Sequence, residues 1–174
     1  MAKRRFSKAW VVGASTGIGR ALTLELAKHG VDVVASARGA AGLAEVVATG
    51  TALPGAIHAL PFDVTDNNAT RAAHHDAGIL LCRMYLFVSC AGTYAPFGAH
   101  DFSAEAFQRI VDVNLMGSVH VLEAAMPAMM ARNAGQIAVV SSVAGYRGLP
   151  AASAYGATKA ALINMCESLK FDLD

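Results

Sequence analysis

The feature that most restricts the fold of this chain is the regular alternation of apolar, strand-like runs with helix-like segments. Five runs have the composition of strands buried on both faces, and they lie at 9–14, 31–38, 56–63, 85–92 and 135–142. Helical patterns separate them at 19–30, 41–50, 67–81 and 103–130, and a last helix contains the stretch SAYGATKAA. This order implies parallel strands joined by right-handed crossovers. We therefore predict an α/β fold, a Rossmann-type doubly wound parallel sheet with about five strands present.

Composition places the chain in one domain. Its 174 residues are enough for a substantial core. Hydrophobic residues make up 55% of them and charged residues 16%, a balance that excludes disorder. The sequence contains no internal repeat and no low-complexity linker. We predict a single domain over 1–174.

Charge and apolar content also exclude several classes of function. The formal net charge is +1, so a nucleic-acid partner is not expected. No apolar run is long enough to cross a bilayer, and the apolar AWVV near the start is too short for the core of a signal peptide. Three dispersed cysteines, Cys82, Cys90 and Cys166, fit a reducing compartment and form no zinc-binding pattern. We predict a cytoplasmic protein without a membrane, nucleic-acid or metal partner.

The first strand-like run ends in a glycine-rich loop, GASTGIGRA, just before the first helix. Such a loop lets backbone N–H groups approach a pyrophosphate at a helix N-terminus, although tight turns need glycine for steric reasons alone. The spacing differs from G-x-G-x-x-G, but the place between a strand and a helix favours a dinucleotide site. Ser15 and Thr16 are expected to donate to the ligand and to cap the helix. The predicted pyrophosphate-binding residues are Gly13, Ser15, Thr16, Gly17, Ile18 and Gly19.

The end of the second strand-like run indicates which dinucleotide binds. A cofactor with a free ribose 2′-hydroxyl usually meets an acidic residue at this point. Here the sequence is ASARGA, with Ala37 at the expected position and Arg38 after it. A guanidinium matches a 2′-phosphate in charge and geometry. We therefore favour NADP(H) over NAD(H); the alternative is an ordinary solvated arginine at a strand end.

Two further strand ends are predicted to contact the cofactor. In FDVTD, the Asp63 carboxylate beside Val64 could accept from the adenine amino group or cap the next helix, for which Asp66 is better placed. In SCAG, the small residues Ala91 and Gly92 leave room for a ribose or a flat ring, or else they form a simple turn. We predict cofactor contacts at Asp63, Val64, Ala91 and Gly92.

Six motifs together resemble one known family in their order and spacing: GASTGIG, DVTD, CAG, VNLMG, VVSSVAG and YGATK. From Trp10 to its end, the chain is similar to the classical short-chain dehydrogenase/reductase family. The resemblance covers about the first two thirds of a typical member, which continues through two more strands and a helical substrate lid. It implies a domain that is incomplete at its C-terminus, or a naturally short protein. The chain departs from the family at Ser89 and Cys90, where two asparagines are usual, and at Val12, where threonine is common.

The resemblance also implies four catalytic residues. The Tyr and Lys of Y-x-x-x-K fall on Tyr155 and Lys159, which implies a general acid/base and a cation that holds the nicotinamide ribose and favours the phenolate. The family's serine, thirteen positions before the tyrosine, falls on Ser142 rather than Ser141 and implies a hydrogen bond to the substrate oxygen. In the motif VNLMG, the family's asparagine falls on Asn114, which implies that this residue supports a water-mediated proton relay to the lysine.

Elementary chemistry agrees with the tyrosine–lysine pair. Free tyrosine has a pKa near ~10, and a nearby cation favours its charged form. Residues four apart share a helix face, so Tyr155 and Lys159 face the same way. We predict an NAD(P)-dependent oxidoreductase that interconverts a carbonyl and a secondary alcohol by hydride transfer. The alternative is a truncated, non-catalytic nucleotide-binding or scaffold protein of the same fold. Taken singly, Asn114 could be a satisfied mid-helix polar group, Ser142 a hydroxyl that caps a turn, and Tyr155 a half-buried aromatic.

Partners follow from the same resemblance. It implies a homodimer or homotetramer through the helices that carry Asn114 and Tyr155, which contain the apolar segments VHVLEAAMPAMMA and AALINMCESL. The loops TYAPFGAHDF and GYRGLPAAS are expected to line a pocket for a small carbonyl or alcohol substrate. His74 and His75, on a polar helix, are expected to be solvated.

Overall fold

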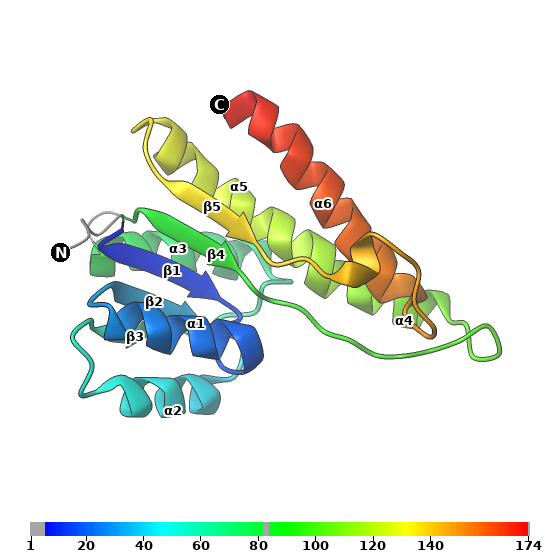
Figure 1. Ribbon diagram of the computed structural model, residues 1–174, viewed down its shortest axis with the longest axis horizontal. Helices are drawn as coiled ribbons and strands as arrows, with labels where there is room; N and C mark the ends of the chain where they lie inside the picture. Colours follow the sequence, from blue (N-terminus) through cyan, green and yellow to red (C-terminus); the bar gives the residue numbers. More distant parts are fainter. Residues whose placement is uncertain (1–5, 82–83, 174) are drawn as a thin grey trace.

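The computed structural model describes residues 6–81 and 84–173 and shows a single sheet of parallel strands (Figure 1). The strands are β1 Lys8–Val12, β2 Asp32–Ser36, β3 Ile57–Ala59, β4 Leu86–Ser89 and β5 Gln136–Val139. Their order across the sheet is β3–β2–β1–β4–β5. The chain therefore winds outward from β1 in both directions, which confirms the predicted doubly wound sheet.

Helices cover the sheet and connect its strands (Figure 1). They are α1 Gly17–Lys28, α2 Ala40–Gly50, α3 Asn67–Leu81, α4 Ala104–Val111, α5 Gly117–Met130 and α6 Ser153–Leu173. A π-helical segment, Asp112–Met116, joins α4 to α5, and a short 3₁₀ segment, Val143–Gly145, precedes α6. Among the helices of the described ranges, none is long and apolar enough to cross a membrane.

Successive strand residues point into two different apolar layers, as the pleat of a strand requires. In β1, Trp10 and Val12 pack in the layer with α3 and α5, whereas Ala9 and Val11 pack in the layer with α1 and α2. The Trp10 ring is fully buried, and its centroid lies 5.4 Å from that of Phe87. Both faces of the sheet are covered, which explains why its central strands are continuous apolar runs.

The third strand is shorter than the sequence predicted. Predicted to run to Asp63, it ends at Ala59. Pro61 lies two residues further on, at the open edge of the sheet, and its missing N–H removes no bond to β2. The amides on either side of this proline still donate to the chain at the end of β2, at 2.9 and 3.1 Å. The backbone therefore still brings Asp63 to the carboxyl end of the sheet.

The long helix predicted over 103–130 is present, but it is not uniform. Ser103 caps its start, because its Oγ accepts from the Ala106 amide at 3.2 Å. Five residues in its middle are π-helical, which changes the direction in which Asn114 points relative to a regular helix. Such segments frequently occur at functional sites.

The prediction of two solvated histidines on α3 is wrong for His74. Its ring centroid lies 5.8 Å from that of Trp10, and burial lowers its pKa, with smaller contributions in the same direction from His75 and Arg132. Helical spacing explains the error, because His74 follows the buried Thr70 by four residues and so lies on the core face of α3. His75 is exposed, as predicted.

Candidate active site

The predicted site residues come together at the carboxyl edge of the sheet. Because all strands are parallel, the loops that follow β1, β2, β4 and β5 all begin at this edge (Figure 1). The strand order reverses between β1 and β4, where open α/β sheets bind their ligands. The topology therefore places the glycine loop, Arg38, Ala91–Gly92 and Ser142 around one region.

The glycine loop is tight for reasons that the structure makes explicit. Gly13 has a φ of +90°, and a side chain there would meet the Ala91 amide nitrogen at 2.5 Å. A Cβ on Gly19 would collide with the Gly13 carbonyl oxygen. Gly17 has a φ of +53°. These contacts hold the start of α1 directly against the ends of β1 and β4, as a loop that cradles a pyrophosphate requires.

The prediction that a hydroxyl side chain caps α1 is not met. Thr16 occupies the N-cap position, but its side chain accepts no hydrogen bond from the first turn. Thr16, Gly17 and Ile18 are all exposed. Within the described part of the chain, no side chain caps the first N–H groups of α1, and these groups carry the partial positive charge of a helix N-terminus. An anion bound here would take the place of the cap.

Arg38 and Asp63 face each other beside this loop. Arg38 Nη1 lies 3.9 Å from Asp63 Oδ2, and the two side chains are 81% and 37% exposed. The other carboxylate oxygen, Asp63 Oδ1, accepts from the amide and hydroxyl of Thr65 at 2.9 and 2.8 Å. Asp63 thus caps a turn and still presents one oxygen, while the Arg38 guanidinium remains open to a ligand. Val64 is buried, and its carbonyl bonds to His120 Nδ1 at 2.9 Å.

Tyr155 and Lys159 lie one turn apart near the start of α6. Tyr155 is half-buried, and Lys159 is only 5% exposed. Lys159 Nζ lies 5.6 Å from the centroid of the Tyr155 ring and donates to the Val140 carbonyl at 2.9 Å. Burial lowers the pKa of Lys159, and Cys90 at the end of β4 acts in the opposite direction. The site therefore contains a largely desolvated cation close to a phenol.

Gly92 brings the loop after β4 close to both Lys159 and Asn114. A Cβ on this glycine would lie 3.4 Å from Asn114 Oδ1 and 3.7 Å from Lys159 Nζ. The Asn114 side chain binds the loop directly, because Oδ1 accepts from the Thr93 amide at 2.7 Å and Nδ2 donates to the Thr93 carbonyl at 3.0 Å. Nδ2 also donates to Thr158 Oγ1 at 3.3 Å. Asn114 is thus a fully buried group that joins the loop to α6.

The two neighbouring serines after β5 have different partners. Ser141 Oγ donates to the Lys159 carbonyl at 2.9 Å and so anchors α6. Ser142 Oγ accepts from the Ala144 amide at 3.2 Å and caps the 3₁₀ segment. Ser142 therefore caps a turn and also keeps its hydroxyl hydrogen for another acceptor. A Cβ on Gly156 would lie 2.9 Å from the Ala144 carbonyl oxygen, so this segment packs closely on α6.

Three residues at the site were not singled out from the sequence. Thr93 and Thr158 bind Asn114, and the Tyr94 ring meets that of Tyr155 edge-on at 5.2 Å. Tyr94 belongs to the loop that was expected to line the pocket, so its place in TYAPFGAHDF was the available signal. Thr158 stands between the motif tyrosine and lysine, but its role depends on contacts that a sequence pattern does not show.

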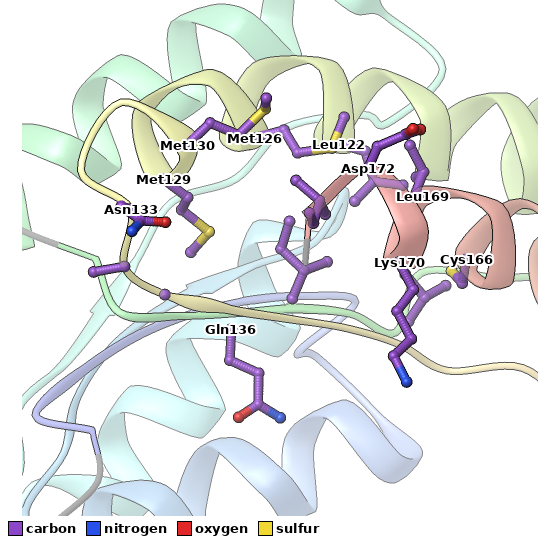
Figure 2. Close-up of a pocket in the computed structure, with 15 residues that line it drawn as sticks. Leu122, Met126, Met129, Met130, Asn133, Gln136, Cys166, Leu169, Lys170 and Asp172 are labelled. Atoms are coloured by element: carbon purple, nitrogen blue, oxygen red, sulfur yellow. The ribbon is translucent and has the colours of Figure 1, made fainter.

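A separate cavity of about 620 Å³ lies at the opposite end of α6. Figure 2 shows it between α5, β5 and α6, with Met129 and Leu169 among the apolar side chains and Gln136 at its rim. No predicted site residue lines it. The carboxyl edge of the sheet and this cavity are therefore distinct regions of the molecule.

Comparison with known proteins gives a consistent result. The family model described as short chain dehydrogenase matches residues 7–174. A protein of Myxococcus xanthus (strain DK1622), named as an uncharacterized oxidoreductase, is 37% identical over 99% of this chain and 68% of its own length. The 17-beta-hydroxysteroid dehydrogenase type 1 of Mus musculus is 35% identical over 91% of this chain and 47% of its own length. The chain thus spans about half to two thirds of these relatives.

Solved structures agree with this match. A xylitol dehydrogenase with bound NAD⁺ superimposes with a TM-score of 0.94 at 27% identity, covering 98% of this chain and 66% of that one. A 7 alpha-hydroxysteroid dehydrogenase, in complex with NADH and 7-oxo glycochenodeoxycholic acid, gives a TM-score of 0.90 at 26% identity. That match covers 96% of this chain and 65% of the other.

Proposed function

The chain belongs to the short chain dehydrogenase family, and we propose that it is an NADP(H)-dependent oxidoreductase that interconverts a carbonyl and a secondary alcohol. One observation carries the proposal: half-buried Tyr155 and buried Lys159 lie one turn apart, with Nζ 5.6 Å from the ring centroid. A desolvated cation beside a phenol is the arrangement that a tyrosine general acid/base requires.

Each polar group then has a chemical task. The nicotinamide, when bound, supplies or accepts the hydride. In the reductive direction, the Tyr155 phenol donates its proton to the carbonyl oxygen as negative charge develops there. The free hydroxyl hydrogen of Ser142 stabilises the same oxygen. Lys159 stabilises the phenolate that remains, and oxidation of the alcohol uses the same groups in reverse.

The residues present fit a dinucleotide. Gly13 and Gly19 leave no room for side chains where the loop must approach a pyrophosphate, and the first turn of α1 has no side-chain cap. Gly92 leaves the space beside Lys159 open. The preference for NADP(H) rests on Arg38, which is exposed just after β2. A guanidinium attracts a 2′-phosphate, whereas a carboxylate at the same place would repel it. We propose that Asp63 and Val64 contact the adenine of the cofactor and that Ala91 lies beside a ribose.

The test is NADPH oxidation against a panel of carbonyl compounds, with wild type and Tyr155→Phe compared. The variant keeps the ring and loses the proton, so turnover should fall by about 100-fold or more. NADPH affinity, measured by titration, should change little. Equal rates in the two proteins would contradict the role of Tyr155. NADPH binding by wild type without turnover of any carbonyl would favour the non-catalytic alternative.

We also propose a homodimer or homotetramer formed through α4–α5 and α6, and a cytoplasmic location. Exposed apolar side chains on these helices support the assembly: Met116 is 39% exposed and Phe171 is 88% exposed. The free thiols of Cys90 and Cys166 fit a reducing compartment. Light scattering tests the assembly, and a monomer at every concentration would contradict it.

A further inference from the structure

A buried threonine connects the two halves of the proposed site. Thr158 Oγ1 donates to the Tyr155 carbonyl at 2.8 Å and accepts from Asn114 Nδ2 at 3.3 Å. Because its hydrogen is committed to the helix backbone, a lone pair of the oxygen is directed at the asparagine amide. Thr158 therefore bonds on one side to the turn of α6 that carries Tyr155 and Lys159.

On its other side the same network reaches the loop after β4. Asn114 holds both the amide and the carbonyl of Thr93, at 2.7 and 3.0 Å. Thr93 follows Gly92 directly, and Gly92 is the residue that approaches Lys159. Three separate segments, the loop, the π-helical segment and α6, are thus joined through two side chains.

Burial makes this network sensitive to the loss of one hydroxyl. Asn114 is 0% exposed and Thr158 is 1% exposed. If the hydroxyl of Thr158 were absent, an Asn114 N–H would lose its partner in a site without direct access to water, which is costly. The amide would then reorient, and its two bonds to Thr93 would move with it.

We infer that Thr158 is a positioning residue, which sets the distance between the turn that faces the cofactor, Ala91–Gly92, and the Tyr155–Lys159 pair. This inference rests on the proposed function. Small displacements between reacting groups are enough to slow a reaction strongly even when binding persists. The chemical step should therefore depend on Thr158 more than cofactor binding does.

The experiment compares Thr158→Val, which keeps the shape and removes both bonds, with Thr158→Ser, which keeps the hydroxyl. Thr70→Val is the matched control, because Thr70 is also fully buried and its Oγ1 donates to a helix carbonyl, that of Asp66, at 2.8 Å. For each protein, kcat, the KM for NADPH, the melting temperature and amide hydrogen exchange over 90–95 are measured.

We expect Thr158→Val to lower kcat about tenfold or more with the KM for NADPH within about threefold, and Thr158→Ser to restore kcat. Thr70→Val should lose stability and keep kcat. The inference is overturned if the kcat of Thr158→Val equals that of Thr70→Val, or if the kcat of Thr158→Ser is as low as that of Thr158→Val.

Hydrogen exchange separates this inference from the proposed function. If wild type turns over no carbonyl, the proposed function fails. Amide exchange over 90–95 then still tests the positioning role of Thr158. Faster exchange there in Thr158→Val than in Thr70→Val supports the positioning role. Equal exchange in the two variants overturns it.

Discussion

At the scale of single residues, the site depends on a cation that is largely removed from water. Lys159 is 5% exposed, and its ammonium donates to the Val140 carbonyl at 2.9 Å. Burial of an ammonium costs free energy and lowers the pKa of Lys159. No Asp or Glu side chain among the described residues forms an ion pair with its ammonium. Its charge is therefore available to Tyr155 and to a bound ligand.

A second charged residue allows a test of cofactor preference. Replacing Arg38 by glutamine should weaken NADPH binding about tenfold or more, because a charge-assisted bond to the 2′-phosphate is lost. NADH has no such phosphate, so its dissociation constant should stay within about twofold. Calorimetric titration with both nucleotides measures the ratio.

Arg71→Gln is the matched control for Arg38→Gln. Arg71 is also an exposed arginine in an ion pair, with its Nη2 3.3 Å from Glu123 Oε1 on α5. Its loss should leave both affinities unchanged. If Arg38→Gln weakens NADPH and NADH equally, the arginine does not select the 2′-phosphate, and the preference for NADP(H) is wrong.

At the scale of elements, the start of α1 shows how packing and ligand binding share the same atoms. Gly19 is buried and lies against the Gly13 carbonyl. Close approach of this helix to the strand ends leaves its first N–H groups directed at the region between β1 and β4. The same closeness makes the glycine intolerant of a side chain.

Two glycine-to-alanine changes test this account. Gly19→Ala should lower the melting temperature and weaken NADPH binding, because its Cβ would collide with the Gly13 carbonyl and push α1 outward. Gly78→Ala, within α3 and with open space around the added methyl, should stabilise the protein by about 0.5–1 kcal/mol through helix propensity. Thermal unfolding with and without NADPH measures the stability and the NADPH binding of both variants. Unchanged NADPH binding in Gly19→Ala would contradict the role given to this close contact.

At the scale of the whole molecule, stability should depend on pH through the contact of His74 with the core. Burial lowers the pKa of His74 when the chain is folded. The unfolded state then binds more protons just below neutral pH, so the free energy of unfolding falls as pH drops through the ordinary histidine range. His74 lowers the free energy of unfolding no further once the pH is below the pKa of His74 in the folded protein.

His74→Gln should therefore flatten the dependence of stability on pH between about pH 7.5 and 5. Denaturant unfolding at several pH values gives the slope. His75→Gln should keep most of the slope, because burial of His74 is the largest cause of its shift and the charge of His75 is a smaller one. A slope in His74→Gln equal to that of wild type would mean that this contact does not govern acid stability.

The class of the fold could be predicted from the sequence, and so could the candidate residues, through their motifs. Apolar runs and helical periods are local properties, so the five strands and the cap of α3 by Asp66 could be predicted from them. The glycines of the loop and the spacing of Tyr155 and Lys159 are local as well. Such patterns indicate the conformation that each segment favours on its own, before it packs against other segments.

Which side chains contact one another could not be predicted, because these contacts depend on the packing of distant segments. Asn114, Thr93 and Thr158 are far apart along the chain, and their network forms because the π-helical segment points the asparagine at a neighbouring loop and helix. The burial of His74 and of Lys159 likewise depends on what packs against their helices. Hydrogen bonds and desolvation act between segments at distances of a few ångströms, and those distances are set by the packing of the whole chain.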